Sequence, residues 1–291
     1  MRWNKITLVG VGLLGGSLGL ALKRRKLARE VAGYVRRPAS IRDCISAGAV
    51  DYATTDLLAA VSGAELVVLC TPLGQMRALT AQMLPALKRG AIVTDVGSVK
   101  ASVARELESI VSKAGAHFVG SHPMAGAEKT GVAAARSDLF ENAACVVTPT
   151  KRLDASAVNR VSRLWQSVGG RVMRLSPELH DQLVARSSHL PHIVAAALAD
   201  HVLHPRQPEQ QADLCANGFR DTTRIASGSP EMWRDIAMAN RKNLGRALDG
   251  FIANLRKIQS ALKRGDAKAL EKFLTTAKSR RDNWCACGAS P

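Results

Sequence analysis

The sequence lacks any apolar run long enough to cross a membrane. A membrane-spanning helix needs about 20 consecutive, mostly apolar residues, and no segment of the 291-residue chain provides them. The first residues also lack the apolar core of a secretory signal peptide, because the apolar run at residues 6–9 stops at Gly10. We therefore expect no membrane association, and the cytoplasm as the compartment.

Aromatic residues are also scarce, whereas basic residues are abundant. A formal net charge of +17 attracts either nucleic acid or small anions. The basic residues are spread along the chain rather than gathered in one arm, and five Phe, four Trp and two Tyr leave few rings for base stacking. The sequence therefore favours anionic small molecules and predicts no nucleic-acid partner.

The six cysteines do not form a metal-binding pattern. Cys285 and Cys287 lie close together, but no second cysteine pair completes a zinc site. His189 and His192 share one helical face at i, i+3 spacing, yet no carboxylate or cysteine stands near them at ligand spacing. We expect no metal.

A glycine-rich turn is the most informative motif. Gly10, Gly12 and Gly15 form a G-x-G-x-x-G pattern between an apolar run and a helix-like stretch that includes Leu13 and Leu14. In dinucleotide-binding proteins these glycines permit the tight turn, the approach of a pyrophosphate and close packing of helix on strand. The free N–H groups of the helix N-terminus then bind the phosphates.

Short β-branched runs alternate with helical patterns through the first 175 residues, which is typical of an α/β fold with a doubly wound, mostly parallel sheet. The predicted strands cover residues 6–9, 31–35, 65–70, 91–95, 117–120, 144–148 and 171–175. Beyond residue 176 the predicted elements are all helical, at 191–204, 231–263 and 267–281. We predict a dinucleotide-binding domain at 1–175 and an all-helical domain at 176–291.

Polar residues follow several predicted strands at the sheet edge where ligands bind. In open α/β sheets this edge is formed by the carboxyl ends of the strands. Thr71 and Pro72 follow the third predicted strand, Ser98 follows the fourth and His122 the fifth. The topology therefore brings a serine and a histidine beside the dinucleotide.

The end of the second predicted strand indicates which dinucleotide binds. NAD-binding proteins carry an acidic residue there for the ribose 2′-hydroxyl, but here Val35 is followed by Arg36 and Arg37, and Glu30 lies at the wrong end of the strand. Two arginines can hold a 2′-phosphate through charge-assisted hydrogen bonds. We predict NADP as the preferred cofactor, with NAD as the alternative.

The other histidines are interpreted as structural or surface residues. His117 begins a strand, and His180, His201 and His204 lie in helical segments. Farther along, Ser229 and Pro230 predict a helix N-cap followed by proline at the first helical position. Arg224 precedes that helix, and the residues alone leave open whether it binds a carboxylate or forms a surface pair.

Taken together, these motifs resemble those of the prephenate/arogenate dehydrogenases of tyrosine biosynthesis. The matching segments are residues 10–17, 94–100, 120–131, 188–192, 219–225 and 232–235, and the resemblance extends over about residues 5–280. It implies an oxidative decarboxylation in which hydride leaves C4 of a cyclohexadienol and the ring carboxylate leaves as CO2.

The resemblance also implies roles for individual residues. His122 would accept the proton of the substrate 4-hydroxyl, with Ser98 orienting the site and also serving as a helix N-cap. Arg224 would bind a substrate carboxylate. The remaining substrate-side residues are His189, His192, Glu128 and Trp233. A homodimer through the helical domain and the absence of a following regulatory domain are further expectations.

Two alternatives remain open at this point. Another NADP-dependent reductase of the same architecture, of the β-hydroxyacid or imine type, would use a lysine or aspartate of the helical domain as its acid. A non-enzymatic NADP-sensing protein would keep the glycine turn but have no use for His122 and Arg224.

Overall fold

The computed structural model describes residues 2–126, 129–150, 153–204, 206 and 208–286. Contacts between residues divide the chain into two units, one ending at Arg241 and the other starting at Lys242. This division falls later than the predicted boundary after residue 175, because helix α7 (Pro177–Val184) contacts α5 (Ala101–Val111) and strand β7 (Ala144–Thr148) in the first unit. The predicted domain boundary remains a prediction.

The first unit is built on one eight-stranded sheet. Its strands are β1 (Trp3–Val9), β2 (Ala28–Tyr34), β3 (Tyr52–Thr54), β4 (Leu66–Leu69), β5 (Ile92–Asp95), β6 (His117–Pro123), β7 (Ala144–Thr148) and β8 (Arg171–Arg174). They lie in the order β3-β2-β1-β4-β5-β6-β7-β8, and every neighbouring pair is parallel except β6 and β7. The predicted doubly wound, mostly parallel sheet is confirmed. The short strand β3 was not predicted.

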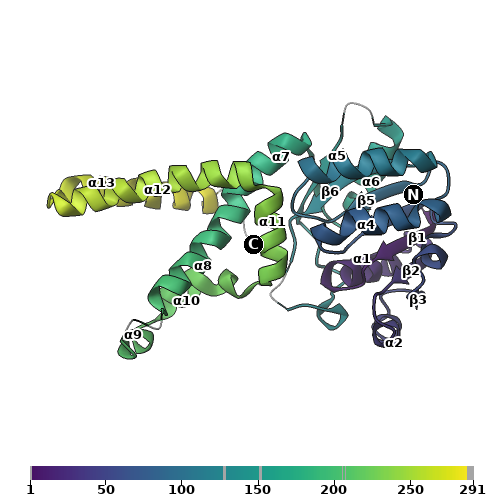
Figure 1. The fold of residues 1–291 in the computed structure, drawn as a ribbon, viewed down its shortest axis with the longest axis horizontal. Helices are drawn as coiled ribbons and strands as arrows, with labels where there is room; N and C mark the ends of the chain where they lie inside the picture. The colour runs from purple at the N-terminus through teal and green to yellow at the C-terminus, as the bar shows by residue number, and fades with distance from the viewer. Residues whose placement is uncertain (1, 127–128, 151–152, 205, 207, 287–291) are drawn as a thin grey trace. The chain divides into compact units, whose positions relative to one another are not determined.

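Apolar side chains alternate along the strands and fill two cores, one on each face of the sheet. Figure 1 shows the ribbon of these strands and of the helices that follow them. Ile6 and Leu8 pack with helices α1 (Leu13–Arg24) and α6 (Ala155–Ser167). Val67 and Leu69 face the opposite side, and the helices there are α3 (Leu57–Val61), α4 (Leu73–Met83) and α5. Burial on both faces is what a parallel sheet with helical crossovers requires.

Helices follow the last strand, as expected. They are α7, α8 (Leu190–Val202), α9 (Gln210–Asp213), α10 (Asn217–Thr223), α11 (Pro230–Ala239), α12 (Arg241–Lys263) and α13 (Ala267–Ala286), and α2 (Ala39–Ser46) lies earlier. A π-helical turn, Ala185–His189, joins α7 to α8. None of the described helices is long and apolar enough to span a bilayer.

Two element boundaries differ from the predictions. The single helix predicted at 231–263 is interrupted at Asn240, whose buried side-chain amide donates to the Asp181 carbonyl (2.8 Å) and whose backbone leaves the helical region. Strand β6 pairs with β5 through residues 117–119 and then with the antiparallel β7 through residues 120–123. Because of this second pairing, the strand continues through His122 and Pro123. His122 therefore lies inside a strand rather than after it.

The glycine turn gives a test of the fold. A Cβ at Gly15 would lie 2.1 Å from the Gly10 carbonyl oxygen, whereas a Cβ at Gly12 would meet nothing within 4 Å. Because the obstacle at Gly15 is backbone, we expect Gly15→Ala to lower the free energy of unfolding by about 1–3 kcal/mol. Gly12→Ala is the matched control and should cost less than about 1 kcal/mol. Urea denaturation measures both, and equal losses would contradict this account of the turn.

Candidate active site

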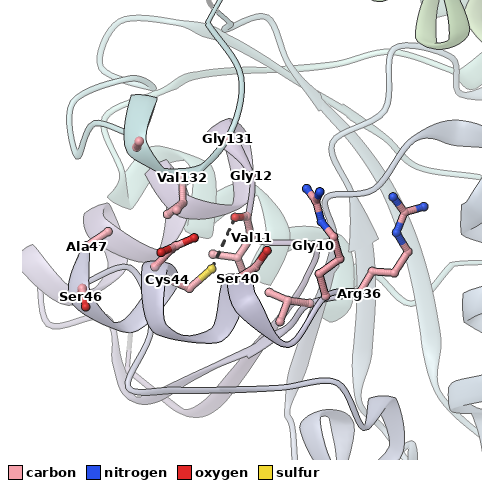
Figure 2. A pocket seen from close by; sticks show the side chains of 14 residues that line it. Gly10, Val11, Gly12, Arg36, Ser40, Cys44, Ser46, Ala47, Gly131 and Val132 are labelled. Carbon is pink, nitrogen blue, oxygen red and sulfur yellow. Dashed lines mark hydrogen bonds between the residues drawn. The ribbon is translucent and has the colours of Figure 1, made fainter.

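The glycine turn borders a pocket with a cavity volume of about 730 Å³ (Figure 2). Gly10 has φ +96°, and a Cβ there would lie 2.9 Å from the Cys70 carbonyl oxygen, so the turn requires glycine. Gly12 is the N-cap of α1 and provides no side-chain cap. The first N–H groups of α1 therefore keep their hydrogen-bonding capacity for a phosphate.

A second part of the pocket lining comes from the residues that follow β2 and from α2. Val35, Arg36 and Arg37 line it directly after β2, together with Ser40 and Asp43. The Val35 side chain is buried and apolar, so it cannot bind a ribose hydroxyl. The two arginines predicted to select the cofactor thus lie in the same pocket as the glycine turn.

The other predicted cofactor residues lie at the ends of β1 and β4. Leu13 and Leu14 are the first residues of α1, and their side chains pack against the core, which leaves their backbone N–H groups for a ligand. Thr71 has a buried hydroxyl without a hydrogen-bond partner among the described residues, and Pro72 is the N-cap of α4. An unpartnered buried hydroxyl at this edge fits a bound dinucleotide.

A buried polar network joins the ends of β5 and β6. The Lys100 ammonium forms an ion pair with Asp95, and it donates to the Ser121 carbonyl (2.8 Å). Asp95 also accepts the backbone N–H of Ser121 (3.1 Å) and of Gly97 (2.9 Å). Neither ion was predicted as part of the site, although both lie in the segment 94–100 on which the family resemblance rests. The pair fixes the strand that carries His122.

His122 is buried and lies in a chain of hydrogen bonds that the sequence did not reveal. Its Nδ1 lies 2.9 Å from His180 Nε2, and His180 Nδ1 lies 2.8 Å from Asp181 Oδ1. All three side chains are at most 6% exposed. His180 had been interpreted as a structural or surface residue; it is buried, and it contacts the candidate catalytic base.

The predicted N-cap role of Ser98 is wrong. Helix α5 starts later, with Lys100 as its N-cap residue and no side-chain cap of its own. Instead, the Asp181 carboxylate accepts the backbone N–H groups of Lys100 (2.7 Å) and Ala101 (2.9 Å). An acidic side chain from α7 thus satisfies the helix terminus, and Ser98 lies half-buried in the loop before it.

A second group of rings lies beside the first. His192 stacks on Trp233 with ring centroids 3.5 Å apart, and His189 meets the same indole edge-on at 6.2 Å. Asn240 Nδ2 lies 3.2 Å from His189 Nδ1. Gly228 permits this arrangement, because a Cβ there would lie 2.7 Å from Trp233 Nε1. The structure therefore brings the predicted residues His189, His192 and Trp233 together.

Arg224 and Glu128 are the two charged residues predicted to bind the substrate. Arg224 is exposed and begins a 3-10 turn, Arg224–Ser227, that contacts α8. Glu128 lies outside the described residues. Downstream, the predicted N-cap is confirmed, because Ser229 Oγ accepts the N–H of Met232 (3.3 Å) and Pro230 opens α11.

Burial favours the neutral form of His122 and His189. It lowers the pKa of His122 well below its ordinary value, and the neighbouring His180, Lys100 and His189 act in the same direction. Burial also lowers the pKa of His189 to about 4, against the opposing charge of Asp181. Neutral imidazoles are the form required to accept a proton near pH 7.

These shifts predict how stability depends on pH. His189 binds a proton less readily in the folded protein than in the unfolded chain, whose histidines have a pKa of about 6.5. As the pH falls from 6.5 towards 4, the unfolded state therefore gains more protons and the free energy of unfolding decreases. For His189 the loss between pH 7 and pH 5 is about 2 kcal/mol.

Urea denaturation of the wild type and of His189→Gln at these two pH values measures the effect. The variant should lose less stability than the wild type on acidification. An equal loss in both proteins would contradict the assignment of the shift to His189.

The described residues contain no group of three His, Cys, Asp or Glu side chains placed to hold a metal ion. Cys285 is exposed near the end of the described chain, and Cys287 lies outside the described residues.

Comparison with known proteins assigns the chain to a class of dehydrogenases. Residues 18–174 match the model of the "Prephenate dehydrogenase, nucleotide-binding domain", and residues 176–276 match the "Prephenate dehydrogenase, dimerization domain". The chain belongs to the prephenate dehydrogenase family. It is an oxidoreductase whose family performs an oxidative decarboxylation in tyrosine biosynthesis, and it uses a nicotinamide dinucleotide. The alternative of a non-enzymatic sensor is thereby rejected.

Individual relatives agree with this family. The chain is 35% identical to the prephenate dehydrogenase of Bacillus subtilis over 96% of this chain and 76% of the relative. It is 36% identical to the cyclohexadienyl dehydrogenase of Zymomonas mobilis over 96% of this chain and 95% of the relative. The crystal structure of the A. aeolicus prephenate dehydrogenase in complex with hydroxyphenyl propionate and NAD+ superposes with a TM-score of 0.91 and 36% identity, covering 97% of this chain and 99% of that one.

Proposed function

We propose that this protein oxidises and decarboxylates prephenate, arogenate or both, giving 4-hydroxyphenylpyruvate or tyrosine. The observation that carries the proposal is the buried His122, a neutral imidazole on β6 at the sheet edge that also carries the glycine turn. Membership of the prephenate dehydrogenase family supports the substrate class. It also weighs against a β-hydroxyacid or imine reductase.

In this mechanism His122 is the general base. It takes the proton of the substrate 4-hydroxyl as carbonyl character develops at C4. The bound nicotinamide supplies the acceptor for the hydride that leaves C4. The ring carboxylate leaves as CO2, and its bonding electrons make the ring aromatic, which supplies the driving force. The resulting phenolate oxygen takes the proton back from His122, which gives the phenol product and restores the neutral base.

The remaining site residues bind and orient the substrate. Arg224 binds a substrate carboxylate, because a guanidinium matches its two oxygens. Ser98 orients the reacting hydroxyl, and its location just before α5 supports that role. The residues proposed to line the substrate from the helical segments and from the loop after β6 are His189, His192, Trp233 and Glu128.

The preferred cofactor in this proposal is NADP. Arg36 and Arg37 line the pocket beside the glycine turn, and the buried Val35 stands where NAD-binding proteins carry an acid. The dinucleotide would be held by residues of the glycine turn and of the strand ends. These residues are Gly10, Gly12, Leu13, Leu14, Gly15, Thr71 and Pro72. The A. aeolicus relative was solved with NAD+, so NAD is the alternative that the assays below must separate.

We propose that the protein forms a homodimer through its helical domain. We also propose that it acts in the cytoplasm. The match of residues 176–276 to a dimerization domain supports the assembly.

One assay tests the reaction itself. The purified protein is mixed with prephenate or arogenate and with NADP or NAD, and both the absorbance of the reduced nicotinamide and the release of CO2 are followed. Equimolar reduction and CO2 release with at least one substrate is the expected result. No turnover in any of the four combinations would refute the proposed function.

His122→Asn tests the base. We expect kcat to fall by about 10²–10⁴, the usual contribution of a general base, with a smaller effect on KM. His201→Asn is the matched control, because His201 is exposed on α8 and should leave kcat unchanged. A wild-type kcat in His122→Asn would remove this residue from the mechanism.

Arg36→Ala tests the choice of cofactor. Loss of a charge-assisted hydrogen bond to the 2′-phosphate should raise the KM for NADP by about 10-fold or more, and change the KM for NAD little. Arg42→Ala removes a nearby exposed arginine that does not line the pocket and should affect neither value. A wild-type enzyme that already prefers NAD would overturn the NADP assignment.

A further inference from the structure

We propose that His180 and Asp181 are positioning residues that hold His122 in one tautomer and balance the charge it acquires. The proposal rests on the proposed function, because that function makes His122 the general base. Its own evidence is a linear hydrogen-bond chain that runs from β6 to the start of α7 and ends on the N-terminus of α5.

The three side chains of His122, His180 and Asp181 are joined by an uninterrupted series of hydrogen bonds. Two contacts of 2.9 and 2.8 Å join three side chains, each by a ring nitrogen or carboxylate oxygen. The rings of His122 and His180 meet edge-on, with centroids 5.1 Å apart and an interplanar angle of 73°. His180 is fully buried and Asp181 is 2% exposed, so bulk water does not compete for these contacts.

Each contact determines the proton position of the next. A carboxylate can only accept, so His180 must carry its proton on Nδ1 to donate to Asp181. In the proposed arrangement this is the only ring proton of His180, so its Nε2 accepts a hydrogen bond and His122 donates to it from Nδ1. The proton of neutral His122 is thereby held on Nδ1, and its Nε2 lone pair is left for the substrate hydroxyl.

Backbone groups fix the Asp181 end of this hydrogen-bond chain. The two Asp181 oxygens accept the N–H groups of Lys100 and Ala101 at the N-terminus of α5, where the helix dipole favours a negative charge. Asn240 binds the carbonyl of the same aspartate. The carboxylate therefore cannot rotate away from His180 without leaving buried N–H groups unpaired.

The hydrogen-bond chain also stabilises the charge that forms on His122 during the reaction. When buried His122 takes the substrate proton, an imidazolium forms with little water around it, and the neighbouring His180, Lys100 and His189 all disfavour this charge. Lys100 is itself paired with Asp95, which leaves Asp181 as the carboxylate connected to His122 by hydrogen bonds. Its negative charge, conveyed through His180, stabilises the imidazolium as it develops.

Two substitutions at His180 separate positioning from packing. His180→Leu removes both ring nitrogens, and we expect kcat to fall by about 100-fold while the substrate KM changes little. His180→Gln keeps an acceptor for the His122 Nδ1 proton and should recover a measurable part of that loss. His117→Gln, at the other end of the same strand, is the control and should retain wild-type kcat.

A spectroscopic measurement tests the tautomer directly. In 15N-histidine-labelled protein without substrate, the resonance of His122 is identified by its loss in His122→Asn. The wild type should show Nδ1 protonated and Nε2 unprotonated, and His180→Leu should show the Nε2-protonated form that prevails in free histidine. Urea denaturation of each variant shows whether the fold persists.

Three results would overturn the proposal: a wild-type His122 protonated on Nε2, a His180→Leu variant with wild-type kcat, or equal losses of kcat in the leucine and glutamine variants. Because the tautomer is read without substrate, it still decides the positioning claim if neither prephenate nor arogenate is turned over. Failure of turnover alone would count against the proposed function.

Discussion

The arrangement of the site depends on one carboxylate, that of Asp181. It comes from helix α7 but satisfies the N-terminus of α5, a helix of the sheet layer, and it binds His180 at the same time. A buried carboxylate is costly unless its lone pairs are used, and here backbone and imidazole N–H groups use them. The first helix after the sheet is therefore tied to the sheet edge by a polar contact that tolerates little displacement.

A second buried charge has a comparable effect on the next strand. The Asp95–Lys100 pair connects the end of β5 with the carbonyl of Ser121 and with the start of α5. Breaking a buried pair on one side leaves an uncompensated charge, which costs about 3–5 kcal/mol. The two networks meet at Lys100, whose backbone binds Asp181 and whose side chain binds Asp95. His122 is held between them on β6.

Much of this organisation follows from local sequence patterns. The glycine turn, the strand ends carrying Thr71 and Ser98, and the arginines after β2 could be predicted because period, turn chemistry and parallel topology are short-range signals. His180 could not be found in the same way. Its partner lies 58 residues away, and a histidine on an amphipathic helix is usually structural. The N-cap of α5 was missed for the same reason, since the capping group is 80 residues distant in Asp181.

The lowered pKa of His122 has consequences for catalysis. A buried imidazole is neutral and ready to accept a proton, but the same burial makes its protonated form unfavourable. A base in that state is effective only if the transition state is given a compensating charge that the resting state does not need. A carboxylate one imidazole away meets this requirement, because its attraction grows as positive charge develops on His122. In the proposed mechanism the site can therefore keep His122 unprotonated between turnovers and still stabilise its protonated form during the reaction.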